Sequence, residues 1–463
     1  MTTTPDVTSG PSSPPAPLGL HPECPDWRRL GPTPVDAALR AAAAGHEAEV
    51  LEREALWSRG FSRRRVLAGG LGVGVAALGS QLVTTRVAYA AAGTTTGTMV
   101  VIFLRGGMDG LSLLVPGADA SYLAARGSIA VPASRLINLD RGFGLHPSMA
   151  PLKSLVDKGQ LAAVPAISTP DLSRSHFQAQ DCLERGGAST GPQTGWLDRV
   201  LQAGGPGTTF RAVAVGGLTP RSLAGLNGAV PFGSLKNLKV QGTGEGALSE
   251  KTSAAIAALY TGLDDPIAVQ AGIAIDAVRT AARLSTSPPV STVTYPTGDL
   301  GSALQDVATL IKSGSGLRVA TVDIGGWDMH TALGTTDSGD MMRSVGALAT
   351  ALAAFAADLG SLLATTTIVT MSEFGRRVTK NASNGVDHGH GGVSLVLGGG
   401  VQGGVKGVWR GLATDVLDQG DVPGTNDYRD LLCEVVGRRL GLTASGLSTV
   451  FPGWTPTPIG VMA

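Results

Sequence analysis

Apolar runs of five to seven residues recur along this chain, and most are followed by a polar loop that contains glycine. Fully apolar runs without alternation are typical of strands buried on both faces of a sheet. The predicted strands are Thr98–Leu104, Leu161–Ile167, Phe210–Val215, Leu317–Val322, Thr367–Met371 and Val393–Leu397. Alanine-rich or amphipathic stretches between or after them predict helices over Pro147–Asp157, Ser249–Leu284, Met341–Leu359 and Asn426–Leu440.

Strands that alternate with helices predict an α/β domain with a central, mostly parallel sheet between two layers of helices. We assign this domain to residues 91–463, with a cap or insertion on the main sheet at about 217–300. Residues 1–60 begin with a Pro/Ser-rich stretch, which predicts disorder, and contain one short helical pattern around Val35–Leu56.

Residues 61–90 have the layout of a twin-arginine export signal. The arginines at 63–65 precede a weakly apolar stretch, 66–83, and Ala88-Tyr89-Ala90 offers a small-residue cleavage site. The alternative is a basic turn before a core helix. The apolar stretch is short and rich in glycine, so we expect no stable membrane span. Export by this route requires the twin-arginine translocase and predicts a periplasmic, cell-envelope or extracellular protein.

Charge and cysteine content narrow the function classes. The 463 residues carry a formal net charge of zero, so no basic excess exists to neutralise nucleic-acid phosphates. Cys24, Cys182 and Cys433 are too few for a disulfide framework or a cysteine-rich zinc site. If Cys24 is removed by processing, the other two either pair or remain buried free thiols.

Two loops after predicted strands carry candidate catalytic groups. Asp109 follows the first strand and a pair of glycines, where it serves either as a metal ligand or as a turn cap. Ser175 follows the second strand at the start of a predicted helix, with Arg174 and His176 beside it. Ser175 is either a nucleophile that Arg174 assists by binding an oxyanion, or a helix N-cap.

Carboxylates and imidazoles gather in three more loops near strand ends. They are Asp323, Asp328 and His330 after one strand, Glu373 after the next, and Asp387, His388 and His390 just before the last. Ligands collect at the carboxyl ends of strands in open α/β sheets. Carboxylate and imidazole without thiolate favour Zn, Mn, Mg or Ca, and we expect one or two divalent ions. The alternative for the first group is a turn with a solvated aspartate and a core-facing histidine.

The segments LRGGMDGL, RSHFQAQD, DIGGWDMH, SEFGR and DHGHGG occur in an order that resembles the domain-of-unknown-function 1501 family. The resemblance covers Thr98 to the C-terminus and places the chain in the alkaline phosphatase and sulfatase superfamily. It implies an alkaline phosphatase-like three-layer sandwich with a metal centre at its strand ends. It also implies that Asp109 is a first-strand ligand and Ser175 the nucleophile. Phe374 departs from the superfamily, which has histidine at this position.

The resemblance therefore predicts an exported, metal-dependent hydrolase of phosphate or sulfate esters, acting on a small-molecule ester or a glycan. The alternative is a non-catalytic exported binding or assembly protein that keeps the fold with a degenerate site. The Phe374 departure favours that alternative.

Overall fold

The computed structural model describes residues 97–463 apart from 188–191, 217, 240–246, 261 and 263–265. The predicted disordered region 1–60, its helical pattern Val35–Leu56 and the predicted export signal 61–90 lie outside the described residues, as does Cys24. These expectations stay predictions.

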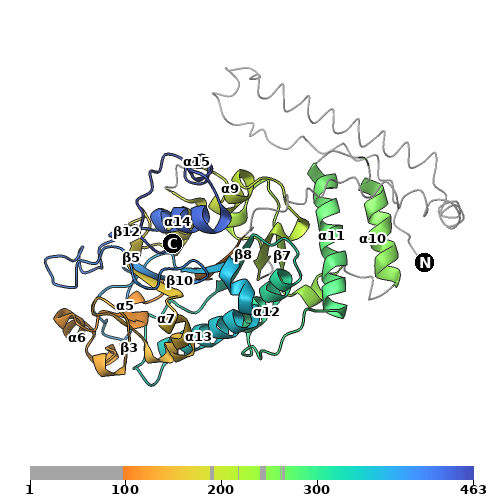
Figure 1. The fold of residues 1–463 in the computed structure, drawn as a ribbon. Helices are drawn as coiled ribbons and strands as arrows, with labels where there is room; N and C mark the ends of the chain where they lie inside the picture. Colours follow the sequence, from red (N-terminus) through yellow and green to blue (C-terminus); the bar gives the residue numbers. More distant parts are fainter. Residues whose placement is uncertain (1–96, 188–191, 217, 240–246, 261, 263–265) are drawn as a thin grey trace, which may run out of the picture. The chain divides into compact units, whose positions relative to one another are not determined.

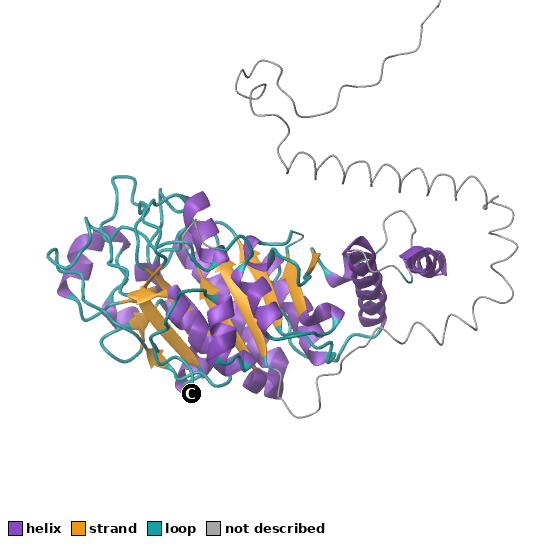
Figure 2. Cartoon of the chain, turned by 90° about the horizontal axis from the view of Figure 1, so that it is seen from above, coloured by secondary structure: helices purple, strands orange, loops and turns teal. Residues whose placement is uncertain are grey.

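A mixed, mostly parallel sheet runs through the described part of the chain (Figures 1 and 2). Its strands are β1 (Thr98–Leu104), β5 (Leu161–Ser168), β6 (Ala212–Val215), β7 (Val230–Phe232), β8 (Val319–Ile324), β9 (Thr366–Met371), β10 (Gly392–Gly398), β11 (Gly404–Val405) and β12 (Asn426–Asp427). The order is β11-β5-β10-β9-β1-β8-β6-β7, and β12 also pairs with β5. Only β10 runs antiparallel to its neighbours, β5 and β9. The predicted α/β class and mostly parallel sheet are confirmed.

Helices cover the sheet and fill the segments between its strands. They are α5 (Gly110–Leu113), α6 (Ala120–Arg126), α7 (Lys153–Asp157), α8 (His176–Arg185), α9 (Trp196–Ala203), α10 (Ala247–Tyr260), α11 (Pro266–Thr286), α12 (Asp299–Lys312), α13 (Asp340–Leu359), α14 (Tyr428–Leu440) and α15 (Ala444–Val450). A separate small antiparallel sheet contains β2 (Leu114–Val115), β3 (Ile137–Asn138) and β4 (Gly144–Leu145).

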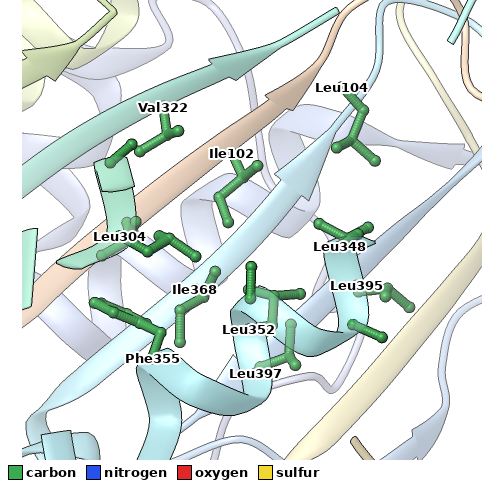
Figure 3. Packing of buried hydrophobic residues seen from close by; sticks show 14 of the residues in the cluster. Ile102, Leu104, Leu304, Val322, Leu348, Leu352, Phe355, Ile368, Leu395 and Leu397 are labelled. Carbon is green, nitrogen blue, oxygen red and sulfur yellow. The ribbon is translucent and has the colours of Figure 1, made fainter. Parts of the chain in front are cut away.

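The core lies on both faces of the main sheet because successive side chains of a strand point to opposite faces. In β1, Ile102 and Leu104 pack on the face covered by α12 and α13, whereas Val101 and Phe103 pack on the face covered by α9 and α14. Figure 3 shows the first of these packings, with Leu352 of α13 among the side chains of β1, β9 and β10. This two-sided burial explains why the strands read as continuous apolar runs.

The structure differs from the predicted helix over Pro147–Asp157 at its start. The segment opens as a 3₁₀ helix, η3 (Pro147–Leu152), and becomes α-helical only at α7. Pro151 lies inside η3 and has no N–H to donate to a preceding turn, which interrupts a regular α-helix.

The segment 217–300 contributes β7 to the edge of the main sheet, where it pairs in parallel with β6. It then forms α10 and α11, as the alanine-rich pattern predicted. The sequence interpretation did not anticipate β7 as a sheet strand or α12 as a helix that begins at the end of the segment. The assignment of 217–300 as a cap stays a prediction.

One helical stretch among the described residues, Asp340–Thr365, is long and apolar enough to cross a membrane by length and composition. It contains α13, whose Leu348, Leu352 and Phe355 are fully buried against the sheet. Packing within the core therefore accounts for the apolar character of this helix.

The two cysteines within the described residues are buried free thiols. Burial raises the pKa of Cys182 to about 11 and that of Cys433 to about 12. Both thiols are therefore protonated and weakly nucleophilic at neutral pH.

Candidate metal centre

Sheet topology brings the loops after four strands to one edge. The carboxyl ends of β1, β8 and β9 lie together because these strands are parallel neighbours. Since β10 is antiparallel to both β5 and β9, the carboxyl end of β5 and the amino end of β10 lie at the same edge. Segments separated by more than 200 residues therefore meet beside one another.

Glycines after β1 let these loops approach closely. Gly107 has φ +63°, and a Cβ on it would stand 2.3 Å from the ring of Phe374. Gly106 has φ +119°, and a Cβ there would stand 2.6 Å from the backbone nitrogen of Asp328. Only glycine accommodates both the backbone angle and the contact.

Three imidazoles and one carboxylate converge at this edge. The Nε2 atoms of His330 and His388 are 2.9 Å apart. Asp328 Oδ1 is 3.0 Å from Nε2 of His330 and 3.2 Å from Nε2 of His388. Asp328 Oδ2 is 3.5 Å from Nε2 of His176, and that nitrogen is buried without a hydrogen-bond partner. His176, Asp328 and His388 form a group whose ligand atoms all lie within 4.8 Å of one another.

Each imidazole is fixed through its other nitrogen by an acceptor. Nδ1 of His388 donates to the backbone carbonyl of Arg174 at 2.9 Å, and that of His330 faces Asp387 at 3.1 Å. Nδ1 of His176 faces Glu373 Oε1 at 2.7 Å. Since ionised carboxylates and carbonyls only accept, these partners hold the proton on Nδ1 in the tautomer that leaves Nε2 of each ring free to bind a cation.

This donor set fits a divalent cation. Two donors on a tetrahedral zinc ion, each at about 2.0–2.1 Å, stand about 3.3 Å apart. The distances from the Asp328 oxygens to the three Nε2 atoms, 3.0 to 3.5 Å, bracket that value, and the ligand atoms of His176, Asp328 and His388 lie within 4.8 Å of one another. Nitrogen lone pairs at such distances repel one another unless positive charge lies between them. Metal-binding histidines almost always donate the other N–H to a carboxylate or carbonyl, as all three do here.

Charge at the centre is set by Asp328 and Arg376. Burial raises the pKa of Asp328, but hydrogen bonds from Arg376 and His388 outweigh it and lower the pKa to about 2. Burial lowers the pKa of His388 more than its hydrogen bond to Asp328 raises it, which keeps the imidazole neutral near pH 7. Both protonation states are those of metal ligands.

Arg376 fastens three of the converging loops together. Its fully buried guanidinium donates to Asp328 Oδ1 at 2.6 Å, to the carbonyl of Val386 at 2.9 Å and to the carbonyls of Gly106 and Gly107. A rigid planar fork with five N–H groups is suited to hold several acceptors in fixed positions.

A buried layer behind the histidines supports them. Glu373 is 1% exposed and its Oε1 also accepts from the backbone of Gly106 at 2.9 Å and from Gln180 at 3.0 Å. Burial raises the pKa of Glu373, but hydrogen bonds from Gln180, His176 and backbone N–H groups together lower it below the usual range. Phe374 packs its ring 4.9 Å from that of His176 and 4.7 Å from that of His388, centroid to centroid. The phenyl ring therefore packs against both imidazoles and limits their movement.

Of the eight residues predicted to bind metal, the structure brings Asp328, His330 and His388 together at the centre, and Glu373 and Asp387 directly behind it. The remaining three have other partners. Asp109 binds the buried guanidinium of Arg126 through both oxygens, at 2.7 and 2.9 Å, Asp323 pairs with Arg105 at 2.9 Å, and His390 donates Nε2–H to the carbonyl of Thr169 at 3.1 Å. Arg126 lies in a neighbouring helix, so no pattern around Asp109 indicated it.

The two residues predicted to be catalytic lie beside the centre. Ser175 is the N-cap residue of α8, half-buried, and its side chain makes no capping hydrogen bond. Arg174 directs its guanidinium to the buried carboxylate of Asp421, at 2.5 and 3.0 Å, while its carbonyl orients His388. The left-handed backbone of Arg174, with φ +55°, turns that carbonyl toward the histidine.

The sequence interpretation missed His176 and Arg376 as site residues. His176 directly follows Ser175 in RSHFQAQD, so it stood inside a segment already singled out. Arg376 follows Glu373 in SEFGR. Their presence in segments typical of the family indicated that they could belong to the site, but the sequence does not determine which side chains point toward the centre.

The match to known families agrees with these segments. The model of the family described as protein of unknown function (DUF1501) matches residues 97–449. The chain belongs to this family. The predicted family is thus confirmed, and every converging residue of the DUF1501 chain lies within the matched range. No curated protein sequence is significantly similar to this one.

Solved structures give weaker similarities. The C-terminal periplasmic domain of EcEptC from Escherichia coli shares 12% identity with the DUF1501 chain, over 78% of this chain and 88% of that domain, with a TM-score of 0.33. That domain in complex with Zn gives a TM-score of 0.32 at 10% identity, over the same shares of the two chains. The sulfatase PsFucS1 from Pseudoalteromonas sp. shares 12% identity over 79% of this chain and 73% of its own, with a TM-score of 0.35.

Proposed function

We propose that this protein is an exported, metal-dependent hydrolase of phosphate or sulfate esters. The observation that carries the proposal is the convergence of three imidazole Nε2 atoms on Asp328, each imidazole fixed by an acceptor at Nδ1. His176, His330, His388 and Asp328 would hold the cation. A divalent cation supplies Lewis acidity toward an ester oxygen in this position.

The residues around the centre have separate tasks in this proposal. Ser175 is the nucleophile, because it stands at the N-terminus of α8 next to the ligand His176. The free N–H groups and the positive end of the helix macrodipole at that terminus stabilise negative charge that develops on a bound ester. Glu373 and Asp387 hold the proton on Nδ1 of their histidines, so that each Nε2 stays available.

A binding protein without turnover is the second candidate. Two observations favour it. No described residue accepts or donates a hydrogen bond at the Ser175 hydroxyl, so no general base stands ready. The guanidinium predicted to bind an oxyanion, that of Arg174, is instead paired with Asp421. A glycan or ester retained without hydrolysis is the expected behaviour in this case.

Two neighbouring histidines provide a matched test. His388→Ala removes an inward nitrogen, whereas His390→Ala, two residues on, removes a ring that bonds Thr169 instead. We expect one divalent ion per chain in the wild type and in His390→Ala by elemental analysis, and loss of the ion in His388→Ala. Turnover of aryl phosphates or aryl sulfates should follow the metal content. A metal-free, inert wild type refutes the hydrolase, and metal binding without turnover favours the binding protein.

The location stays part of the proposal. The arginines at 63–65 and the Ala88-Tyr89-Ala90 site predict export by the twin-arginine translocase to the periplasm, cell envelope or medium. Replacing Arg63 and Arg64 by lysine should leave the protein in the cytoplasm, which fractionation of the producing cells would measure. Unchanged export of that variant would remove the prediction.

A further inference from the structure

The fixed charges at the centre limit the charge of the group that can bind there. Three carboxylates contact the inward histidines directly, namely Asp328, Glu373 and Asp387. One guanidinium, that of Arg376, contacts Asp328. The three carboxylates and the Arg376 guanidinium together carry two net negative charges, which one divalent cation neutralises.

The charged side chains around this group add no net positive charge. Arg126 is paired with Asp109 in a fully buried ion pair, and both oxygens of that carboxylate are engaged. Arg174 and Arg377 share the carboxylate of Asp421. Arg105 is in turn shared by the carboxylates of Asp323 and Glu184. These charged groups together therefore carry no net charge.

We propose, resting on the proposed function, that this centre holds one divalent ion and acts on singly charged tetrahedral esters, which are sulfate monoesters or phosphate diesters. A doubly charged phosphate monoester would bring one negative charge that the described residues do not balance. Uncompensated charge in a partly desolvated site weakens binding of both the ester and its transition state. A second cation would remove this limit, but Asp109, one of the predicted metal ligands, holds Arg126 instead.

The test compares three esters that share the same leaving group, phenol, but differ in charge. Phenyl sulfate and diphenyl phosphate carry one negative charge at pH 8, and phenyl phosphate carries two. With metal-loaded wild-type protein, kcat/KM for at least one singly charged ester should exceed that for phenyl phosphate by tenfold or more. Phenyl phosphate should also inhibit more weakly than the unreactive methyl sulfate. The two singly charged arms decide between sulfate and phosphate-diester chemistry.

Two carboxylate variants separate the charge effect from general damage. Asp387→Asn removes one negative charge but keeps an oxygen that accepts from His330. In this variant, the ratio of kcat/KM for the singly charged ester to kcat/KM for phenyl phosphate should fall at least fivefold. Asp323→Asn removes a carboxylate that faces Arg105 instead of the histidines, and should leave the preference within twofold.

Each outcome separates this inference from the proposed function. One bound ion with phenyl phosphate as the better substrate overturns the charge argument and leaves the hydrolase intact. Two bound ions, or an unchanged preference in Asp387→Asn, also overturns it. Absence of both metal and turnover overturns both proposals together.

Discussion

Glu373→Gln tests whether the buried layer behind the histidines controls metal binding. The substitution keeps the size of the side chain and removes its charge. Three donors converge on Glu373 Oε1: Nδ1 of His176 at 2.7 Å, the backbone of Gly106 at 2.9 Å and Nε2 of Gln180 at 3.0 Å. Since the carboxylate is 1% exposed, water does not replace these contacts.

The expected loss follows from the difference between charged and neutral hydrogen bonds. A hydrogen bond to a charged group contributes about 1.5–3 kcal/mol and a neutral one about 0.5–1.5 kcal/mol. Weakening the His176 bond by about 1–2 kcal/mol frees the ring to rotate and lowers the basicity of Nε2. Changes in groups that orient metal ligands typically lower metal affinity by about 10–100-fold. This range is similar in size to the loss of about 1–2 kcal/mol expected for the His176 bond.

The assay is competition of the protein against a chromophoric chelator for Zn²⁺ at pH 7.5. The matched control is Glu184→Gln, which changes a second buried acid. Glu184 lies in α8, and its partners are Arg105 and the backbone of Ser222. We expect Kd for Zn²⁺ to rise 10–100-fold in Glu373→Gln and to stay within about threefold in Glu184→Gln. Equal affinity in wild type and Glu373→Gln refutes the orienting role of this carboxylate.

Three further predictions test the nucleophile, the buried ion pair and the pH dependence. Ser175→Ala should abolish ester turnover while Zn²⁺ affinity stays within about twofold, since no contact of the hydroxyl holds a ligand; retained turnover would exclude it as nucleophile. Arg126→Met should lower the free energy of unfolding by about 3–5 kcal/mol in urea titrations, because it leaves the buried Asp109 unpaired. Arg135→Gln, in an exposed pair, should leave the unfolding midpoint nearly unchanged, and equal effects of the two variants would contradict this contrast. Burial lowers the pKa of His146 to about 4, so neutral His146 contributes its full stability above its unfolded pKa of about 6.5, and this contribution is lost as pH falls toward 4. Urea titrations should show a free energy of unfolding that falls between pH 7 and 4.5, and His146→Asn should reduce that fall. An equal fall in both proteins would count against this role of His146.

The sequence by itself determined the strands and the loops that carry the chemistry. A strand buried on both faces is mostly apolar, so β1, β8, β9 and β10 were visible as runs within a residue or two of their observed bounds. The polar groups after those runs belong at the edge of the sheet, because the strand interiors cannot accommodate them. The family segments named the same loops.

Only the tertiary structure decided which atoms converge. A metal-binding atom must lie within a fraction of an ångström of its required position. Acceptors that are distant in the sequence fix this position, because the carbonyl of Arg174 orients His388 and Glu373 orients His176. Asp109 does not join the centre, because Arg126, 17 positions further along the chain, satisfies both of its oxygens. Local sequence records neither kind of contact, since the fold brings together residues that are about 200 or more positions apart.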